Sequence, residues 1–464
     1  MGLDDGDVDA FDAFLSWCRD VGVYVREDAI DFTFARARGG GVSSSEKNRG
    51  VCATTSLERG DVLARIPFDA CLTLEGCGRR DVADAVNEAL DDARVEARWL
   101  CALAAALCVE RFLGDKSRWY AYDRVLPRRE KNVVSMWSDG ERLELLAGTE
   151  IEQSMRDELA AAKREWDSVV GPAFETHGVS CSFDDFHAAR TVVSSRAFSM
   201  TPTKSGLAPI ADAFNHRTGD HDVNVGDGGA TTTSSDALCV KVTKGHVGVG
   251  DELFNTYGFL GNAKLLNSYG FTQEDNPADE VRLSTTNIRT AAAIAGVSGS
   301  QISKRFDWME KTEICAPDAS FAFVKNHDIP EDLISVAWAC VASEDEFQKI
   351  RHTNRRADAL EAIRTVSEST NNSPHDDGLP SMMTAEVANV ISLAIERRLT
   401  LYCSPTLSGS VTSNERTKLA MRLVEAERAI LESTLMKIAH IRGFETSKKR
   451  AKASDSSSAF DLFD

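Results

Sequence analysis

Two short segments of this 464-residue chain carry more chemically useful side chains than their surroundings. Residues 251–271 read DELFNTYGFLGNAKLLNSYGF and contain two tyrosines, Tyr257 and Tyr269, each followed by glycine. Residues 209–217 read PIADAFNHR and offer an Asn-His pair next to an aspartate. None of these side chains is a strong nucleophile, and no Ser-His-Asp or Cys-His order is evident. The two segments therefore favour chemistry that depends on positioning and weak polar contacts.

Composition and charge restrict the class of protein. A hydrophobic content of 42% in a chain of this length suits two or three globular lobes with their own cores. The formal net charge of −19 repels nucleic-acid phosphates, so we expect no direct nucleic-acid binding. The same charge favours a basic protein partner such as a Lys-rich tail, although solubility alone explains it equally well.

The 11 cysteines are odd in number, and none forms a Cys-x-x-Cys pair. This pattern argues against a zinc cluster and against a disulfide framework, and it is typical of buried thiols in a reducing compartment. Near the Asn-His pair only His221 and Asp222 could add metal ligands, so we expect no metal.

The sequence also bears on location. The longest apolar run, Trp99–Val109, is shorter than the ~20 residues that a membrane span needs, and we expect no membrane association. The acidic first twenty residues resemble neither a secretory signal nor a transit peptide. The basic cluster at 448–452 is interpreted as a solvated tail in preference to a nuclear signal. We expect a cytoplasmic or nuclear monomer; a plastid location stays open if an upstream segment is missing.

Hydrophobic spacing predicts the elements of the first half. Phe11, Phe14, Leu15 and Cys18 recur at helical spacing. Further along the chain we expect a strand at 32–37, a Gly-Ser-rich loop at 39–45, two short strands at 51–54 and 62–66 around a turn, a helix from 82, a helix at 99–113 stopped by Gly114, and helices with breaks to about 198.

The second half is predicted in the same way. Residues 210–257 return to short strands with a polar loop at 221–236. Asn262 is a candidate N-cap for a short helix that ends at Gly270. Beyond 277 the pattern is helical, with a loop at 370–380 and a long amphipathic helix at 420–438. The expected domains are an N-terminal helical segment (1–30), a β-rich domain (31–275) with a helical insert at about 91–195, a helical lobe (276–446) and a disordered tail (447–464).

Three features have both a functional and a structural interpretation. A glycine between a loop and a strand, as in Arg49-Gly50, lets backbone approach a ligand, but it also suits a plain strand start. Arg196 ends a helical stretch and could hold a carboxylate bidentately, or lie on the surface. Tyr257 and Tyr269 could orient an amine without carrying charge, because free tyrosine has a pKa of about 10, or could pack in the core.

Taken together these segments resemble the SET-domain protein methyltransferases, in the group typified by the Rubisco large-subunit lysine methyltransferase. The resemblance runs from about residue 32 to about residue 441. It rests on the order and spacing of these segments: RGVCATTSLERGDVLARIP (49–67), SRWYAYDRVLP (117–127), MWSDGERLELLAGT (136–149), SSRAFS (194–199), ADAFNHR (211–217), FNTYG (254–258), YGF (269–271) and SNERTKLAMRLVEAERAILESTL (413–435).

The resemblance implies an α+β fold: a β-rich knotted SET core with a helical insert, followed by an all-α C-terminal lobe that binds the protein substrate. The FNTYG strand would thread beneath the Asn-His loop. The implied cofactor is S-adenosylmethionine. Arg196 would hold its carboxylate, and the implied cofactor-binding residues are Arg49, Gly50, Arg196, Asp212, Asn215, His216 and Tyr257. Tyr257 would be the catalytic residue, and Tyr269 and Phe271 would wall the substrate channel.

The implied activity is lysine N-methylation of a protein substrate. Methyl transfer is an in-line displacement, so alignment removes much of its barrier. The alternatives are methylation of a protein histidine and an inactive SET-like scaffold that only binds partners. One departure from the plant enzyme is Met200, which stands where that enzyme carries a second arginine. Another is the long polar loop at 216–236, which leaves the choice of substrate open.

Overall fold

The computed structural model describes residues 5–32, 50–93, 95, 97–226, 236–370, 382–402, 415–439 and 441. The chain divides into two compact units. The first comprises Met1–Arg142, Ile151–Ala278 and Val411–Leu419. The second comprises Leu143–Glu150, Asp279–Ser410 and Ala420–Asp464. Each unit has its own cluster of buried apolar side chains, which is what an independently packed lobe requires.

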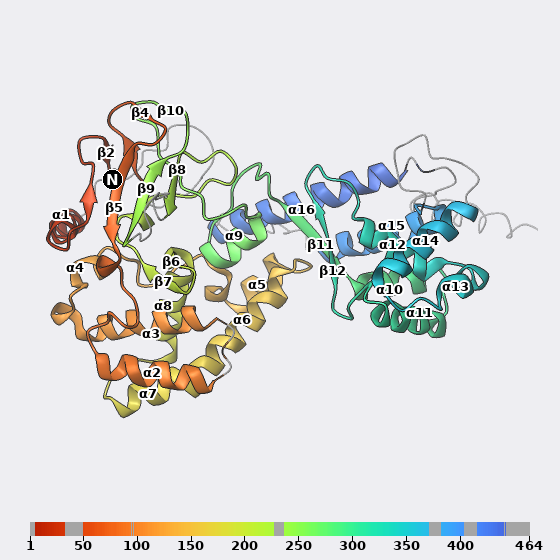
Figure 1. Cartoon of the computed structure of the whole chain (residues 1–464), viewed down its shortest axis with the longest axis horizontal. Helices are drawn as coiled ribbons and strands as arrows, with labels where there is room; N and C mark the ends of the chain where they lie inside the picture. The colour runs from red at the N-terminus through yellow and green to blue at the C-terminus, as the bar shows by residue number, and fades with distance from the viewer. Residues whose placement is uncertain are drawn as a thin grey trace, which may run out of the picture. The chain divides into compact units, whose positions relative to one another are not determined.

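The first unit opens with helix α1 (Asp5–Asp20), which buries Phe14 and Cys18 and confirms the predicted amphipathic helix. A four-stranded antiparallel sheet follows, in the order β1-β5-β9-β8 (Figure 1). Its strands are β1 (Tyr24–Val25), β5 (Val62–Pro67), β9 (Ala237–Val242) and β8 (Val223–Gly226). Strands β8 and β9 come from the part of the chain that follows the helical insert, so the sheet joins segments about 170 residues apart in the sequence.

Small two-stranded sheets complete the β-structure of this unit. They are β2 (Ile30–Asp31) with β3 (Cys52–Ala53), β4 (Leu57–Glu58) with β10 (His246–Val247), and β6 (Ala197–Thr201) with β7 (Lys204–Leu207). The strands predicted at 51–54 and 62–66 are present as β3 and β5, but they do not pair with each other: β3 pairs with β2, and β5 lies between β1 and β9. The β6–β7 pair was missed by the sequence analysis.

The helical insert follows β5, as predicted. Its helices are α2 (Arg80–Asp92), α3 (Arg98–Leu113), α4 (Tyr120–Asp123), α5 (Asp139–Leu145), α6 (Ile151–Glu165), α7 (Gly171–Thr176) and α8 (Phe183–Arg196). Helix α3 ends before Gly114, whose φ of +58° suits a residue without a side chain. Helix α8 begins with a reciprocal capping box between Ser182 and Asp185 and packs against α3. The helix ends at Arg196 because Ala197 has an extended backbone and begins β6.

The short helix α9 (Asn262–Tyr269) is present at the predicted place, with one correction. Its N-cap is Gly261, and the Asn262 side chain instead exchanges two hydrogen bonds with the backbone of Gln273. Gly270 ends the helix in the left-handed conformation, with φ of +76°. A Cβ atom there would lie 2.8 Å from a backbone nitrogen of the loop that precedes α5. The glycine is therefore needed for both conformation and space.

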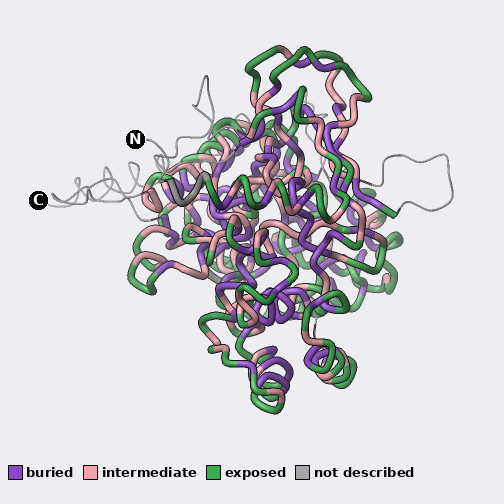
Figure 2. The backbone as a smooth tube through the Cα atoms, turned by 90° about the vertical axis from the view of Figure 1, so that its left-hand side faces the viewer, coloured by how far each residue is buried: buried purple, intermediate pink, exposed green. Residues whose placement is uncertain are grey.

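The second unit is mainly helical. Its helices are α10 (Thr285–Ile294), α11 (Gly299–Lys311), α12 (Glu331–Val341), α13 (Glu344–Ile350), α14 (Arg356–Thr370), α15 (Ala385–Leu401) and most of α16 (Glu415–Ala439). The long helix predicted at 420–438 is thus confirmed. The expectation of an all-α lobe needs a correction, because β11 (Glu280–Ser284) and β12 (Ser320–Val324) form an antiparallel pair. Figure 2 shows buried and exposed stretches alternating along the helices, as amphipathic packing requires.

Several predictions concern residues outside the described part of the chain. They are most of the strand at 32–37, the loop at 39–45, Arg49, residues 227–235 of the polar loop, most of the loop at 370–380 and the tail at 447–464. Among the described helices, none combines the length and apolar character needed to cross a bilayer. Within the same residues, no group of three or more His, Cys, Asp or Glu side chains is arranged to hold a metal ion.

Candidate active site

The Asn-His loop lies beside the segment that carries Tyr257. His216 and Asn255 form a parallel β-bridge, in which the Asn255 N–H donates to Asn215 O (2.7 Å) and the Arg217 N–H donates to Asn255 O (2.9 Å). The bridge uses the backbone groups on either side of His216, so the N–H and C=O of His216 itself are directed away from Asn255. The threading of one segment beneath the other stays a prediction.

His216 is held as a neutral side chain. Its Nδ1 accepts a hydrogen bond from the Tyr257 N–H (2.9 Å), which places the ring proton on Nε2, 2.7 Å from Thr218 Oγ1. Burial lowers the pKa of His216 to about 4. The Thr218 hydroxyl in turn donates to Leu260 O (3.1 Å). His216 therefore holds the backbone of Tyr257 in place, and its ring does not take up a second proton at neutral pH.

Four aromatic rings from three segments form a row that closes on itself, so that each ring has two of the others as neighbours. The Tyr257 ring stacks on His216 with centroids 4.8 Å apart and on Tyr269 with centroids 5.0 Å apart, both at 28°. Phe271 lies 6.2 Å from Tyr269 and 6.0 Å from His216. The structure thus brings together the residue predicted to be catalytic and the two predicted to wall a channel. Such a row presents apolar faces that attract cations.

The hydroxyl group of Tyr257 has a fixed direction. It donates to Phe214 O (3.0 Å), so its lone pairs are turned away from that carbonyl. Burial raises the pKa of Tyr257 above its ordinary value, and burial also raises the pKa of Tyr269. Both phenols are therefore uncharged at neutral pH and can donate or accept a hydrogen bond without adding charge to the site.

The loop that supplies the Phe214 carbonyl begins with a residue in a strained backbone conformation. Ile210 is fully buried and has φ of +72°, which a β-branched residue rarely adopts. It precedes the 3₁₀ turn η5 (Ala211–Ala213), which carries Asp212. Backbone strain of this kind costs about 1–3 kcal/mol and is tolerated where the surroundings impose it, often at functional sites.

Arg196 is engaged by the carboxylate of Glu130 and, at a longer distance, by that of Asp212, whose Oδ2 lies 3.9 Å from Nη1. Its Nε donates to Glu130 Oε1 (3.0 Å), its Nη2 lies 2.9 Å from the same oxygen, and its Nη1 donates to Asp212 O (3.2 Å). Burial alone would lower the pKa of Arg196, but the charges of Glu130 and Asp212 outweigh it and raise that pKa. Glu130 thus holds the Nε–Nη2 edge of the guanidinium and Asp212 holds Nη1, which leaves one further N–H on each of Nη1 and Nη2 for another acceptor.

Sequence reasoning missed Glu130. It lies 66 residues before Arg196, on the loop after α4, and also accepts from Ser195 Oγ (3.2 Å). Its backbone N–H donates to Thr191 Oγ1 (3.0 Å), which ties the loop to α8. No local spacing signals a contact between residues so distant in the sequence, so the signal could only come from the fold.

Gly50 and Asn215 both lie next to the side chain of Glu252. The Asn215 Nδ2 donates to Glu252 Oε1 (2.7 Å). A Cβ atom at position 50 would lie 2.7 Å from that oxygen and 3.3 Å from the Asn215 Nδ2, so a larger residue cannot be placed there without displacing one of them. The neighbouring predicted residue, Arg49, lies outside the described part of the chain.

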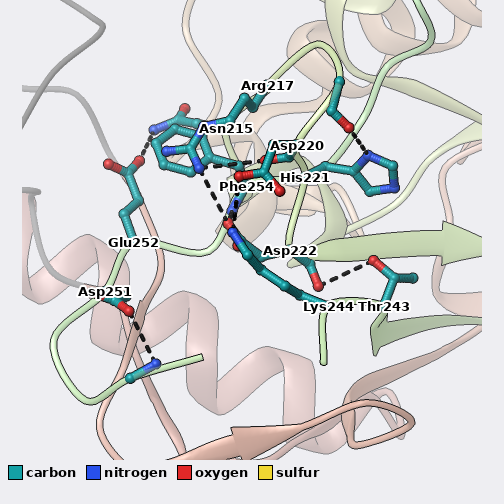
Figure 3. Close-up of polar contacts among 12 residues, drawn as sticks. Asn215, Arg217, Asp220, His221, Asp222, Thr243, Lys244, Asp251, Glu252 and Phe254 are labelled. Atoms are coloured by element: carbon teal, nitrogen blue, oxygen red, sulfur yellow. Dashed lines mark hydrogen bonds and ion pairs between the residues drawn. The ribbon is translucent and has the colours of Figure 1, made fainter. Parts of the chain in front are cut away.

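Asp222 joins the Asn-His loop to the Tyr257 segment (Figure 3). Its side chain is 6% exposed and accepts from the Phe254 N–H (3.0 Å), while Lys244 Nζ lies 3.1 Å and Arg217 Nη1 3.8 Å from its oxygens. The Asp222 N–H also donates to Phe254 O (2.8 Å). The guanidinium carbon of Arg217 lies 3.7 Å from the centroid of the Phe254 ring. These contacts hold the two site segments in register.

We expect Asp222→Ala to lower the free energy of unfolding by about 2–4 kcal/mol, because it leaves the Phe254 N–H without its acceptor, Arg217 without its carboxylate and Lys244 with Asp220 alone. Asp220→Ala is the matched control, since Asp220 is 76% exposed and pairs only at the surface with Lys244. Its loss should cost less than about 1 kcal/mol. Urea denaturation of both variants checks this, and equal stabilities would contradict the role given to Asp222.

Comparisons with known proteins were made for the sequence and for the fold. No protein-family model matches the chain. The chain is 25% identical over 386 residues to the human N-lysine methyltransferase SETD6, covering 75% of this chain and 79% of that protein. It is 22% identical over 448 residues to the zebrafish (Danio rerio) N-lysine methyltransferase setd6, covering 90% and 89%.

Solved structures give the fold. A SET domain of LSMT bound to lysine and AdoHcy superposes with a TM-score of 0.65 at 19% identity, covering 96% of this chain and 95% of that one. Rubisco LSMT bound to AdoMet superposes with a TM-score of 0.66 at 17% identity, covering 96% of each. The predicted α+β architecture is therefore confirmed, and so is the resemblance on which it rested.

Proposed function

We propose that this chain, which has the SET-domain architecture of the Rubisco large-subunit methyltransferases, is an S-adenosylmethionine-dependent protein-lysine N-methyltransferase. The observation that carries the proposal is the row of aromatic rings around Tyr257, packed against the Asn-His loop. Similarity to N-lysine methyltransferases and to structures bound to AdoMet or lysine supports it.

The residues present fit the cofactor. At Gly50 only a residue without a Cβ leaves Glu252 and Asn215 in place, so the glycine keeps the Asn215 amide in its position in the site. The outward N–H and C=O of His216 form a donor–acceptor pair of the kind that reads a purine edge. Arg196, Gly50, Asn215 and His216 would hold S-adenosylmethionine, with Asp212 supporting Arg196. When bound, the cofactor supplies an electrophilic methyl group on a sulfonium.

The protein's own groups prepare the nucleophile. The attacking lysine must be neutral, although free lysine has a pKa of about 10.4. Apolar walls from Tyr269 and Phe271 exclude water and disfavour a charged amine there. The Tyr257 hydroxyl, fixed by Phe214 O, can orient the amine and accept weak C–H···O contacts from the transferring methyl. No side chain needs to form a covalent bond.

The finer assignments are part of the same proposal. We place substrate docking in the helical lobe, residues 276–446, and favour a Lys-rich protein segment because the chain has a net charge of −19. We propose a monomer in the cytoplasm or nucleus that contacts neither nucleic acid nor membrane directly.

The test uses the purified full-length chain. S-adenosylmethionine at 100 times its Kd should stabilise the folded protein by about 2.7 kcal/mol, seen as a higher melting temperature. Incubation with labelled cofactor and a cell extract, followed by mass spectrometry, should find label on a lysine side chain. Label on histidine would identify the alternative reaction, and cofactor binding without any transfer would point to a scaffold. Absence of cofactor binding would overturn the proposal.

A further inference from the structure

Glu252 is a half-buried carboxylate that the proposed chemistry does not use. It lies opposite Cys52 in an antiparallel bridge, where the Leu253 N–H donates to Val51 O (2.8 Å) and the Ala53 N–H donates to Asp251 O (2.9 Å). This pairing fixes the backbone of Glu252 and directs its side chain towards Asn215 (Figure 3). Glu252 thus lies between the Gly50 segment and the Asn215 segment, and the proposed function assigns both segments to cofactor binding.

The contact with Asn215 has a defined polarity. An ionised carboxylate has no proton to give, so it can only accept, and here it accepts from the amide nitrogen at 2.7 Å. The two ends of an asparagine amide have nearly the same shape, so neighbours decide which way it points. The flipped amide would place its oxygen against the carboxylate, which is repulsive. Glu252 therefore holds Asn215 in one of its two orientations.

The position of the carboxylate is itself defined. Its Oε1 lies 2.7 Å from the place that a Cβ atom of residue 50 would occupy. Burial raises the pKa of Glu252, whereas the Asn215 hydrogen bond and the charge of Arg217 favour the ionised form. A partly buried carboxylate is unfavourable unless it has hydrogen-bond or charge partners. The packing of Gly50, Asn215 and Glu252 therefore stabilises the ionised carboxylate in this position.

We propose that Glu252 is a positioning residue for cofactor binding: it fixes the Asn215 amide in one orientation, and the glycine at position 50 gives it the room to do so. The proposal rests on the proposed function, because it takes Gly50 and Asn215 as cofactor-lining residues. Nothing in the local sequence marks Glu252 for this role.

The first test is Glu252→Gln. A glutamine amide has an accepting oxygen and a donating NH2 group, and by flipping it can present either one, so it no longer imposes one orientation on Asn215. We expect about 10-fold weaker binding of S-adenosylmethionine and of S-adenosylhomocysteine by calorimetry, a difference of about 1.4 kcal/mol. KM for the cofactor should rise with little change in kcat. The unliganded melting temperature should stay at the wild-type value.

The matched control is Glu75→Gln, which removes the same charge from an exposed position in the same unit. It should leave cofactor affinity unchanged. If Glu252→Gln binds the cofactor as tightly as the control, the positioning role is wrong. If its unliganded melting temperature falls and its affinity does not, Glu252 is structural and the proposal is also wrong.

A double-mutant cycle tests the role of Gly50. Gly50→Ala alone should weaken binding, because its Cβ displaces the Glu252 carboxylate. In a Glu252→Ala background the added methyl finds room, so its further effect should be smaller. If the effects of the two substitutions on cofactor affinity simply add, Gly50 and Glu252 are not coupled and this part of the proposal is wrong. These outcomes bear on the role of Glu252 only if the wild-type protein binds the cofactor. If the wild-type protein does not bind it, the proposed function itself is wrong.

Discussion

Tyr257→Phe is expected to lower kcat about 100-fold while the cofactor affinity stays close to that of the wild type. The substitution keeps the ring, and so keeps the stacking on His216 and Tyr269. It removes the hydroxyl that donates to Phe214 O and that, in the proposed function, orients the amine. A contact needed in the transition state and not for cofactor binding lowers kcat more than it changes affinity. Single-turnover methylation, combined with calorimetry for the cofactor, checks this.

Stability must be measured on the same variant, because the lost hydrogen bond leaves a backbone carbonyl unpartnered and costs about 1–3 kcal/mol. Tyr269→Phe is the matched control, since it removes a hydroxyl from the adjacent ring of the same row. We expect it to keep most of the turnover. A folded Tyr257→Phe protein with wild-type kcat, beside an impaired Tyr269→Phe, would move the catalytic role to Tyr269.

The elements predicted best were those whose sequence signal is local. The helix at 99–113 has a continuous apolar pattern and a terminal glycine, and the structure shows α3 with Gly114 at its end. The long helix at 420–438 repeats apolar residues at helical spacing and is found as α16. Both signals survive because neighbours in the sequence are also neighbours in a helix.

Short strands were predicted less well, because their partners are distant in the chain. The pairing of β5 with β9 joins residues about 170 positions apart, and no pattern in either strand names the other. The strands at 280–284 and 320–324 were missed for the same reason, within a region whose composition favours helix. Two-residue strands such as β1 and β4 are set by the sheet and not by their own sequence.

The site shows the same division. Tyr257, Tyr269, Asn215 and His216 stand in recognisable motifs, and the structure brings them together as a group. Glu130 and Glu252 escaped notice because their partners, Arg196 and Asn215, are 66 and 37 positions away. Motifs identify the groups that face a ligand, whereas the side chains that hold those groups in place are identified only by the fold.

Arg196→Ala is expected to weaken cofactor binding by about 2–5 kcal/mol, the usual cost of truncating one partner of a hydrogen-bonded charge pair. The N–H groups of Nη1 and Nη2 that Asp212 and Glu130 do not use would face the cofactor carboxylate. Calorimetry on the purified variant measures the loss directly. Arg190→Ala is the matched control, because Arg190 lies on the same helix and pairs with the buried Glu165, away from the rings of the site. That control should lose stability without losing cofactor affinity.

The contact with Glu130 makes a second measurement necessary. Arg196→Ala leaves the Glu130 carboxylate, whose side chain is 18% exposed, without its cation, so the single variant should also unfold more easily. Removing both charges, as Arg196→Ala with Glu130→Ala, should restore much of the stability, because no unpaired carboxylate remains. It should not restore cofactor affinity if Arg196 contacts the ligand. A double variant that binds the cofactor normally would show that Arg196 serves only to neutralise Glu130, and the carboxylate of the cofactor would then need another partner.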